Sequence, residues 1–382
     1  MSKRSFRIAL GIVLGSVILV VAIVGWMVHR ALSYADDPHG GTGKEVEVEI
    51  AKGMSFPTVA KLLADKKLID RPTWFRLYAM WEGETTNVKT GKYMIKDNLP
   101  PKKVLEIIIA GVKEITITVK LPEGKNMLEY FELIAKACPT GQKEPCPHIA
   151  SAKDLEAVGR DKEFLQAHAI TGDTVDGYLF PDTYQFRVGE RPRAVIEKLI
   201  TRHQEVWQEL LAKRGKETAK LKDKLRWTDR DILTMASIVE KEAVEPAERP
   251  CIAQVFINRL TKESFKPHRL ETDPTIRYGC LVPLQKSAAC IAWNEPCKKE
   301  GKPPGCDRLH RAQLDDKDNP YNTYQHEGLP PGPIANPGRA SIDATLAPNG
   351  CDYLFFVAKN EREHVFAKTL EEHKKNVDKY QK

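Results

Sequence analysis

The sequence predicts an α+β protein with a single N-terminal transmembrane helix, a small α+β module and a larger α+β domain. Residues 8–28 form an uncharged, mostly apolar run. In the rest of the 382 residues, short segments that alternate apolar and polar side chains are mixed with segments of helical periodicity. Hydrophobic residues make up 42% of the chain and charged residues 29%, which is typical of a globular protein and not of a disordered or fibrous one.

The net charge argues against a nucleic-acid-binding protein. The formal charge is +7, and three of these charges belong to Lys3, Arg4 and Arg7, which precede the apolar run. The small excess left for the rest of the chain is not the basic surface that binding to a phosphate backbone requires. We therefore expect no nucleic-acid partner.

The apolar run has the length of a membrane span. At about 1.5 Å per residue, residues 8–28 cover about 31 Å, close to the thickness of the hydrocarbon core of a bilayer. The preceding basic residues predict a cytoplasmic tail over 1–7 and export of everything after His29, with 29–45 as a linker that lifts the folded part off the membrane. A cleaved signal peptide is the alternative, but its apolar core is usually shorter. The sequence thus predicts a lipid bilayer contact through residues 8–28.

Cysteine usage agrees with export. The chain has eight cysteines, an even number that is typical of disulfides in an oxidising compartment. A zinc site is the alternative, but no C-x-x-C motif is present. Cys138 and Cys146 are the pair expected from spacing, and the pairing of the other six stays open. The Pro- and Lys-rich stretch 280–306 is expected to be a loop.

Residues 46–112 predict the small module. A strand is expected over 46–50, a helix capped by Ser55, a helix after Pro72, a weak strand over 93–95 and a helix over 101–110 that ends at Gly111. The composition is compatible with a spacer or with a glycan-binding module.

Residues 113–382 predict the larger domain, with a strand from Ile115 and a carboxylate on an apolar helix face. Thr228 and Asp231 form a capping-box start for a helix that ends near Glu242. Glu240 continues the stripe of Leu233 and Ala236, so we expect it on the buried side, where lost hydration raises a carboxyl pKa and suits a general acid. The alternative is a structural carboxylate paired with Arg259.

Two later loops have the composition of a binding site. One covers residues 270–275 and the other runs from Pro320 to Ile334. Their prolines and glycines favour a tight, extended backbone, and their tyrosines, Asn322 and Thr323 offer stacking faces and hydrogen-bond donors suited to sugars. A rigid structural turn is the alternative.

Taken together, these segments resemble the endolytic murein transglycosylase family, also called MltG or YceG-like. The resemblance covers about residues 46–376, and it rests on five motifs in the family's order: 237–242 (SIVEKE), 255–260 (VFINRL), 272–275 (TDPT), 321–324 (YNTY) and 328–334 (GLPPGPI). Residues 177–184 and the single N-terminal anchor add to it.

The resemblance implies a bacterial inner-membrane enzyme whose periplasmic part has a LysM-like module and a catalytic domain. Such enzymes cut peptidoglycan glycan strands at the MurNAc–GlcNAc bond, leave a 1,6-anhydro-MurNAc end, use no cofactor or metal and work near peptidoglycan synthases. The first glutamate of the family's E-K-E motif, Glu240 here, is the implied acid/base. The expected substrate-binding residues are Glu271, Asp273, Tyr321, Asn322 and Tyr324.

Two departures from the family pattern keep other functions open. Glu271 stands where glutamine is expected, and Asp176 where glutamate is expected. A second carboxylate, Glu271 or Asp273, would suit a glycoside hydrolase that releases a reducing sugar. A non-catalytic scaffold that binds glycan through 46–112 is the third hypothesis. The cysteine-containing stretches near 138–146 and 280–306 are insertions of unknown effect.

Overall fold

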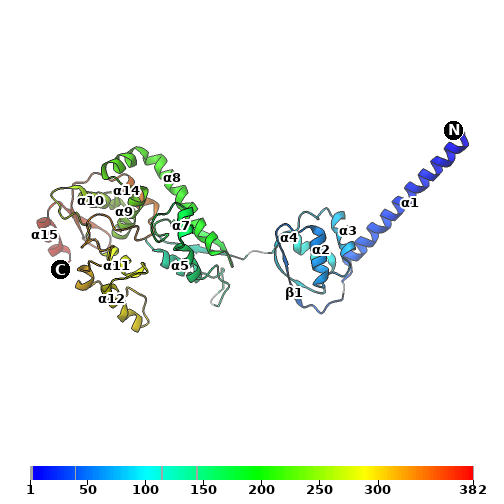
Figure 1. The fold of residues 1–382 in the computed structure, drawn as a ribbon, viewed down its shortest axis with the longest axis horizontal. Coiled ribbons are helices and arrows are strands. Elements are labelled where there is room, and N and C mark those ends of the chain that lie inside the picture. The colour runs from blue at the N-terminus through cyan, green and yellow to red at the C-terminus, as the bar shows by residue number, and fades with distance from the viewer. Residues whose placement is uncertain (1–2, 39, 113–114, 143–144, 382) are drawn as a thin grey trace. The chain divides into compact units, whose positions relative to one another are not determined.

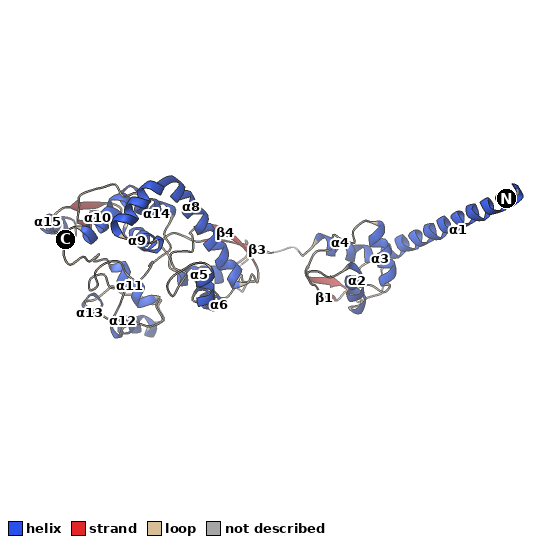
Figure 2. Ribbon diagram, turned by 45° about the horizontal axis from the view of Figure 1, so that its top comes forward, coloured by secondary structure: helices blue, strands red, loops and turns tan. Residues whose placement is uncertain are grey.

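The computed structural model describes residues 3–38, 40–112, 115–142 and 145–381, and its contacts divide the chain into two compact units, 1–114 and 115–382. The predicted mixture of helices and short strands is confirmed (Figure 1). Within the described residues the strands form three separate antiparallel pairs, β1–β2, β3–β4 and β5–β6, shown red in Figure 2. The fold therefore relies on helix packing more than on a continuous sheet.

Helix α1 (Lys3–Asp36) is longer than the predicted span. Its part from Leu14 to Asp36 is long and apolar enough to cross a membrane. The helix continues through the first half of the predicted linker, because Ala31 and Ala35 are buried against the module that follows. The part 29–36 of the predicted spacer is thus a packed helix.

The first unit otherwise follows the predicted order. It consists of β1 (Glu45–Ile50), α2 (Phe56–Asp65), α3 (Pro72–Trp81), β2 (Gly91–Lys96) and α4 (Pro101–Ala110). The Ser55 side chain caps α2, as expected from its hydroxyl and its place before the first helical turn. Strand β1 pairs with β2 from Glu45–Lys96 to Ile50–Gly91, and the helices cover this pair with apolar side chains such as Phe75 and Val104.

The second unit is a helical body that the β3–β4 and β5–β6 pairs flank. Its elements are β3 (Thr116–Lys120), α5 (Met127–Ala135), α6 (Ala152–Gly159), α7 (Lys162–Ala167), β4 (Thr183–Arg187), α8 (Pro192–Leu225), α9 (Asp229–Glu242), the 3-10 helix η1 (Pro246–Glu248), α10 (Arg249–Thr261), α11 (Asp273–Leu281), α12 (Ala288–Lys299), α13 (Arg311–Leu314), α14 (Arg339–Leu346), β5 (Phe355–Ala358), β6 (His364–Ala367) and α15 (Leu370–Tyr380). Helix α9 is central, because residues from Ile232 to Val239 are all buried.

All eight cysteines are paired. The predicted Cys138–Cys146 disulfide is present, and the others join Cys251 to Cys351, Cys280 to Cys290 and Cys297 to Cys306. The loop predicted for 280–306 is wrong in part. Helix α12 fills its middle, with Pro296 inside the helix, because the buried Cys290, Trp293 and Cys297 lie at helical spacing and pack inward.

Candidate active site

Helix α9 brings two glutamates to its last turn. Thr228 and Asp231 form the predicted capping box, with each side chain accepting a hydrogen bond from the backbone N–H of the other residue. The helix ends at Glu242, and Ala243 is already extended. Glu240 and Glu242 therefore project from the same end of a buried helix toward different surroundings.

The Glu240 side chain is enclosed, and both of its carboxylate oxygens have polar partners. Its side chain is 7% exposed, so it is on the buried face that the helical stripe predicts. Its Oε2 accepts hydrogen bonds from the Gly338 backbone N–H at 3.0 Å and from the Ser341 hydroxyl at 2.7 Å. Arg249 Nη2 lies 3.7 Å from Oε1. Glu240 thereby ties α9 to the start of α14, where the helix dipole favours a negative charge.

Arg259, the structural partner considered for Glu240, has other contacts. Its guanidinium donates to the backbone carbonyls of Leu354, at 2.7 Å, and of Leu270. The carboxylates whose negative charges raise the pKa of Arg259 are those of Glu271 and Glu242. Arg259 therefore joins α10 to the loop before α11 and to the approach to β5.

A second carboxyl, that of the exposed residue Glu123, lies close enough to Glu240 for the two charges to interact. A Cβ atom at Gly338 would come within 1.8 Å of Glu123 Oε1, so a larger residue there would have to displace the end of this side chain. Partial burial raises the pKa of Glu123, the nearby Glu240 charge raises it further and Arg249 opposes both. The sequence did not indicate Glu123, because it follows a strand by a turn and meets Glu240 only in the folded chain.

Glu242 lines an open cavity of about 580 Å³. The cavity wall includes Glu271, Asp273 and Tyr324 from the two predicted loops, His364 from β6 and residues of α15. Burial raises the pKa of the Glu242 carboxyl, the Thr272 hydroxyl lowers it by a smaller amount and the Asp273 charge raises it. The structure therefore places Glu242 rather than Glu240 beside three of the five predicted substrate-binding residues.

Hydrogen bonds hold the two predicted loops together. The Thr323 hydroxyl accepts from the Thr272 N–H at 3.1 Å and shares a hydrogen bond of 2.9 Å with the Thr275 hydroxyl. The Tyr324 hydroxyl donates to Asp273 Oδ1 at 2.9 Å. Glu271 adopts a φ of 53°, in the left-handed region, at the point where the first loop turns. The two loops that composition identified as candidates for a binding site thus meet through direct side-chain contacts.

Asn322 and Tyr321 do not line this cavity. The Asn322 side chain is fully buried, and its amide nitrogen donates to the backbone carbonyls of Gln313, Leu314 and Asp316. The expectation that Asn322 offers a free donor to sugar is therefore wrong, because its donors are already used to shape the loop. Tyr321 packs on Tyr278, with ring centroids 4.8 Å apart.

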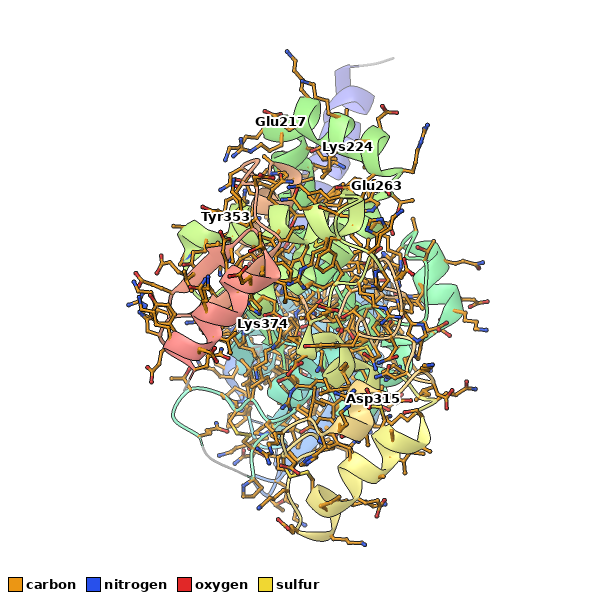
Figure 3. All side chains as sticks on the ribbon, turned by 90° about the vertical axis from the view of Figure 1, so that its left-hand side faces the viewer. Glu217, Lys224, Glu263, Asp315, Tyr353 and Lys374 are labelled. Carbon is orange, nitrogen blue, oxygen red and sulfur yellow. A yellow bond between two sulfur atoms is a disulfide. The ribbon has the colours of Figure 1, made fainter. Side chains whose placement is uncertain are left out.

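A second cavity lies next to Lys241, the residue between Glu240 and Glu242. It has a volume of about 580 Å³ and is lined by Lys241, Tyr278, Pro303 and Pro304 among others. Pro274 lines both this cavity and the one at Glu242. The two cavities therefore have one wall residue in common. Figure 3 shows α15, marked by Lys374, well apart from the α12–α13 segment, marked by Asp315.

Asp176 is a buried carboxyl behind this second cavity. It accepts hydrogen bonds from the Met127 N–H at 2.6 Å and from the Tyr278 hydroxyl at 2.8 Å. Burial raises its pKa to about 7, although both hydrogen bonds oppose the shift. The carboxyl thus links α5, the aromatic segment 176–184 and α11.

The buried Asp176 predicts a pH-dependent stability. The folded state holds the proton up to about pH 7, whereas the unfolded chain releases it near pH 4, so the free energy of unfolding falls as the pH rises through this window. In Asp176→Asn, we expect the loss of stability between pH 5 and 8, measured by urea unfolding, to be smaller than in the wild type by about 2.5 kcal/mol. The exposed Asp173→Asn is the matched control, and an equal slope in all three proteins would contradict the prediction.

Glu242 was not among the residues singled out from the sequence. Met235, Ile238 and Val239, which are all buried, precede it by seven, four and three residues on one face of the helix, so a helical stripe leads to it. In the folded chain Glu242 is also enclosed by the loop at Thr272 and by β6, which come from distant parts of the sequence. Within the described residues, no group of three or more His, Cys, Asp or Glu side chains is placed to hold a metal ion.

These features define a two-unit protein with one apolar N-terminal helix and a carboxylate-lined groove. The chain belongs to the YceG-like family, whose model matches residues 48–379. It is 31% identical over 344 residues to the endolytic murein transglycosylase of Bacillus subtilis, covering 88% of this chain and 84% of that protein. A Streptococcus pneumoniae protein of the same name is 25% identical over 355 residues, and this chain spans 58% of its length.

A solved structure agrees with the family assignment. The fold is similar to a 2.6 Å crystal structure of a YceG-like protein from Listeria monocytogenes, with a TM-score of 0.50 and 29% sequence identity. The match covers 87% of this chain and 99% of that chain.

Proposed function

We propose that this protein is an endolytic murein transglycosylase, which cuts peptidoglycan glycan strands at the MurNAc–GlcNAc bond and leaves a 1,6-anhydro-MurNAc end. Membership of the YceG-like family and the names of the relatives support the class of reaction. The observation that carries the proposal is the half-buried Glu242 carboxyl, whose pKa is raised, in a cavity that also holds Asp273 and Tyr324.

The proposed general acid/base is a glutamate at the end of α9. Glu242 is the stronger choice, because burial raises its pKa and its cavity is open to a ligand. Glu240, the residue predicted from the sequence, stays the alternative. Its Oε2 already accepts two hydrogen bonds, and Arg249 lies beside its Oε1, which suits a structural carboxylate.

The reaction needs only one carboxyl group. The protonated acid gives its proton to the bridging oxygen, and the C1–O bond breaks with its electron pair leaving on that oxygen. The sugar becomes oxocarbenium-like. The carboxylate then takes the proton from the 6-hydroxyl of MurNAc as O6 forms a bond to C1, which restores the acid and closes the anhydro ring. In this scheme Asp273 and Tyr324 position the sugar.

A hydrolase is the second candidate function. Glu271 and Asp273 line the same cavity as Glu242, and either carboxylate could activate a water molecule or stabilise the charged sugar. The product would then carry a reducing end instead of an anhydro ring. A non-catalytic scaffold is less well supported, because a glycan-binding surface gains nothing from a buried carboxyl whose pKa is raised.

We also propose that α1 anchors the protein in the inner membrane, with the N-terminus cytoplasmic and the rest periplasmic. The apolar stretch Leu14–Asp36 and the basic residues of the preceding tail support this orientation. Four disulfides suit an oxidising compartment. The order β1–α2–α3–β2 supports a LysM-like module in the first unit, and peptidoglycan synthases are the proposed protein partners.

Mass spectrometry of the products tests the proposed reaction. The full-length protein in detergent is incubated with uncrosslinked peptidoglycan strands, and we expect internal cuts that yield 1,6-anhydro-MurNAc ends. Reducing ends, heavier by one water, would move the assignment to a hydrolase. Strands that are bound but remain uncut would favour the scaffold.

A further inference from the structure

The end of α1 and the module that follows form one packed body. Ala31 and Ala35 are 2% and 1% exposed and belong to the hydrophobic core of the module. The Tyr34 hydroxyl accepts a hydrogen bond from the Arg71 N–H at 3.4 Å, just before α3. The helix that begins in the apolar segment therefore continues without a break into the core of this unit.

Two contacts give the direction of α3 along α1. Arg71, before the first turn of α3, is bonded to Tyr34, and Trp74, within that turn, contacts Trp26 with ring centroids 6.1 Å apart. Trp26 precedes Tyr34 by eight residues, which is about 12 Å along a helix axis. Helix α3 thus runs from the module side of α1 toward its apolar part.

The far end of α3 presents two large apolar side chains to solvent. Met80 is 62% exposed and Trp81 is 60% exposed. Trp81 follows Trp74 by seven residues, so both lie on the same face of the helix. Single exposed apolar residues are ordinary, but a tryptophan beside a methionine at the end of a helix that approaches a membrane span is typical of an interfacial contact.

Basic side chains lie near the first turn of α3, farther from the apolar run of α1 than Met80 and Trp81. A cavity of about 600 Å³ is lined by Arg30, Lys67 and Arg71, together with Asp37, Asp70, Tyr34 and Trp74. Arg30 follows the apolar run directly, at the depth where lipid phosphates would lie if residues 8–28 fill the hydrocarbon core. Apolar side chains below and cations at the headgroup level are the pattern of a membrane-seated surface.

We propose that the first unit rests on the bilayer, with Met80 and Trp81 at the tip of α3 inserted into the outer leaflet of the membrane. The partner of this face is lipid, not glycan. The inference rests on the proposed membrane anchor, and it extends that anchor from one helix to a second contact. The module then has a fixed height and tilt at the membrane surface, which a flexible spacer would not give it.

Depth-dependent quenching of tryptophan fluorescence tests the proposal on the full-length chain in phosphatidylglycerol-containing vesicles. The chain has six tryptophans, and the difference between wild type and Trp81→Phe isolates the emission of Trp81. Lipids brominated close to the headgroup should quench this emission by about half or more, as for an interfacial tryptophan. The difference between wild type and Trp26→Phe reports on the anchor in the same samples.

The outcomes distinguish the proposed membrane contact of the module from the proposed membrane anchor. If Trp26 is quenched and Trp81 is not, α1 spans the membrane but the module does not rest on it, and the inference fails. If neither is quenched, the anchor itself fails. A second variant, Met80→Lys, should shift the Trp81 emission to longer wavelength by moving the tip toward water, and an unchanged spectrum would also overturn the inference.

Discussion

Replacing Glu242 by glutamine should abolish glycan cleavage. Glutamine keeps the size of the side chain but has no proton to give, and removal of a general acid costs about 10²- to 10⁴-fold in rate. Glu240→Gln should retain most of the activity and lose stability instead, because its one remaining oxygen can still accept from Gly338 and Ser341 but an NH2 group replaces the charged oxygen beside Arg249. The measurement is the rate of release of glycan fragments by each variant.

Glu245→Gln is the matched control for both variants. Glu245 lies just past the end of α9, and the described contact of its carboxylate is a partly exposed ion pair with Arg362 at 3.7 Å. Its loss should change neither rate nor stability measurably. An inactive Glu240→Gln protein that still unfolds at the wild-type temperature, beside an active Glu242→Gln protein, would reverse the assignment in favour of the sequence prediction.

Local sequence signals predicted the elements that carry the site. The capping box at Thr228 fixed the start of α9, and the apolar stripe placed Glu240 on the buried face. Proline and glycine density located the loops at 270–275 and 320–334, which meet through Thr323. Each of these signals depends on residues that are close together in the chain, so it can be recognised from the sequence alone.

The features that the sequence did not predict depend on distant contacts. The side-chain amide of Asn322 is a group suited to sugar binding, but its N–H donors are bonded to three backbone carbonyls of the preceding turn. The last part of α1 has a polar flank typical of a linker, yet Ala31 and Ala35 make it part of a core. The pairing of six cysteines depends on which helices pack together, and spacing does not determine that.

The disulfide between Cys251 and Cys351 should be the covalent link with the largest effect on stability. It joins α10 to the segment before β5 and closes a loop with a sequence separation of 100, which contains both site loops. Replacing both cysteines by alanine should lower the free energy of unfolding by about 3–5 kcal/mol, because the unfolded chain regains the entropy of a long open loop. Urea unfolding under oxidising conditions measures this loss.

The Cys138–Cys146 disulfide provides the comparison that tests this reasoning. It closes a loop with a sequence separation of only 8, so its removal should cost about 2 kcal/mol less by the same loop-entropy relation. Near Cys351, the Asn258 amide also donates to the backbone carbonyls of Cys351 and Tyr353, both at 2.9 Å. These bonds keep the segment in place when the disulfide is absent, so the double-alanine protein should stay folded and cleave glycan at low temperature. Equal losses from the two disulfides would show that the long one acts through native contacts and not through the unfolded chain.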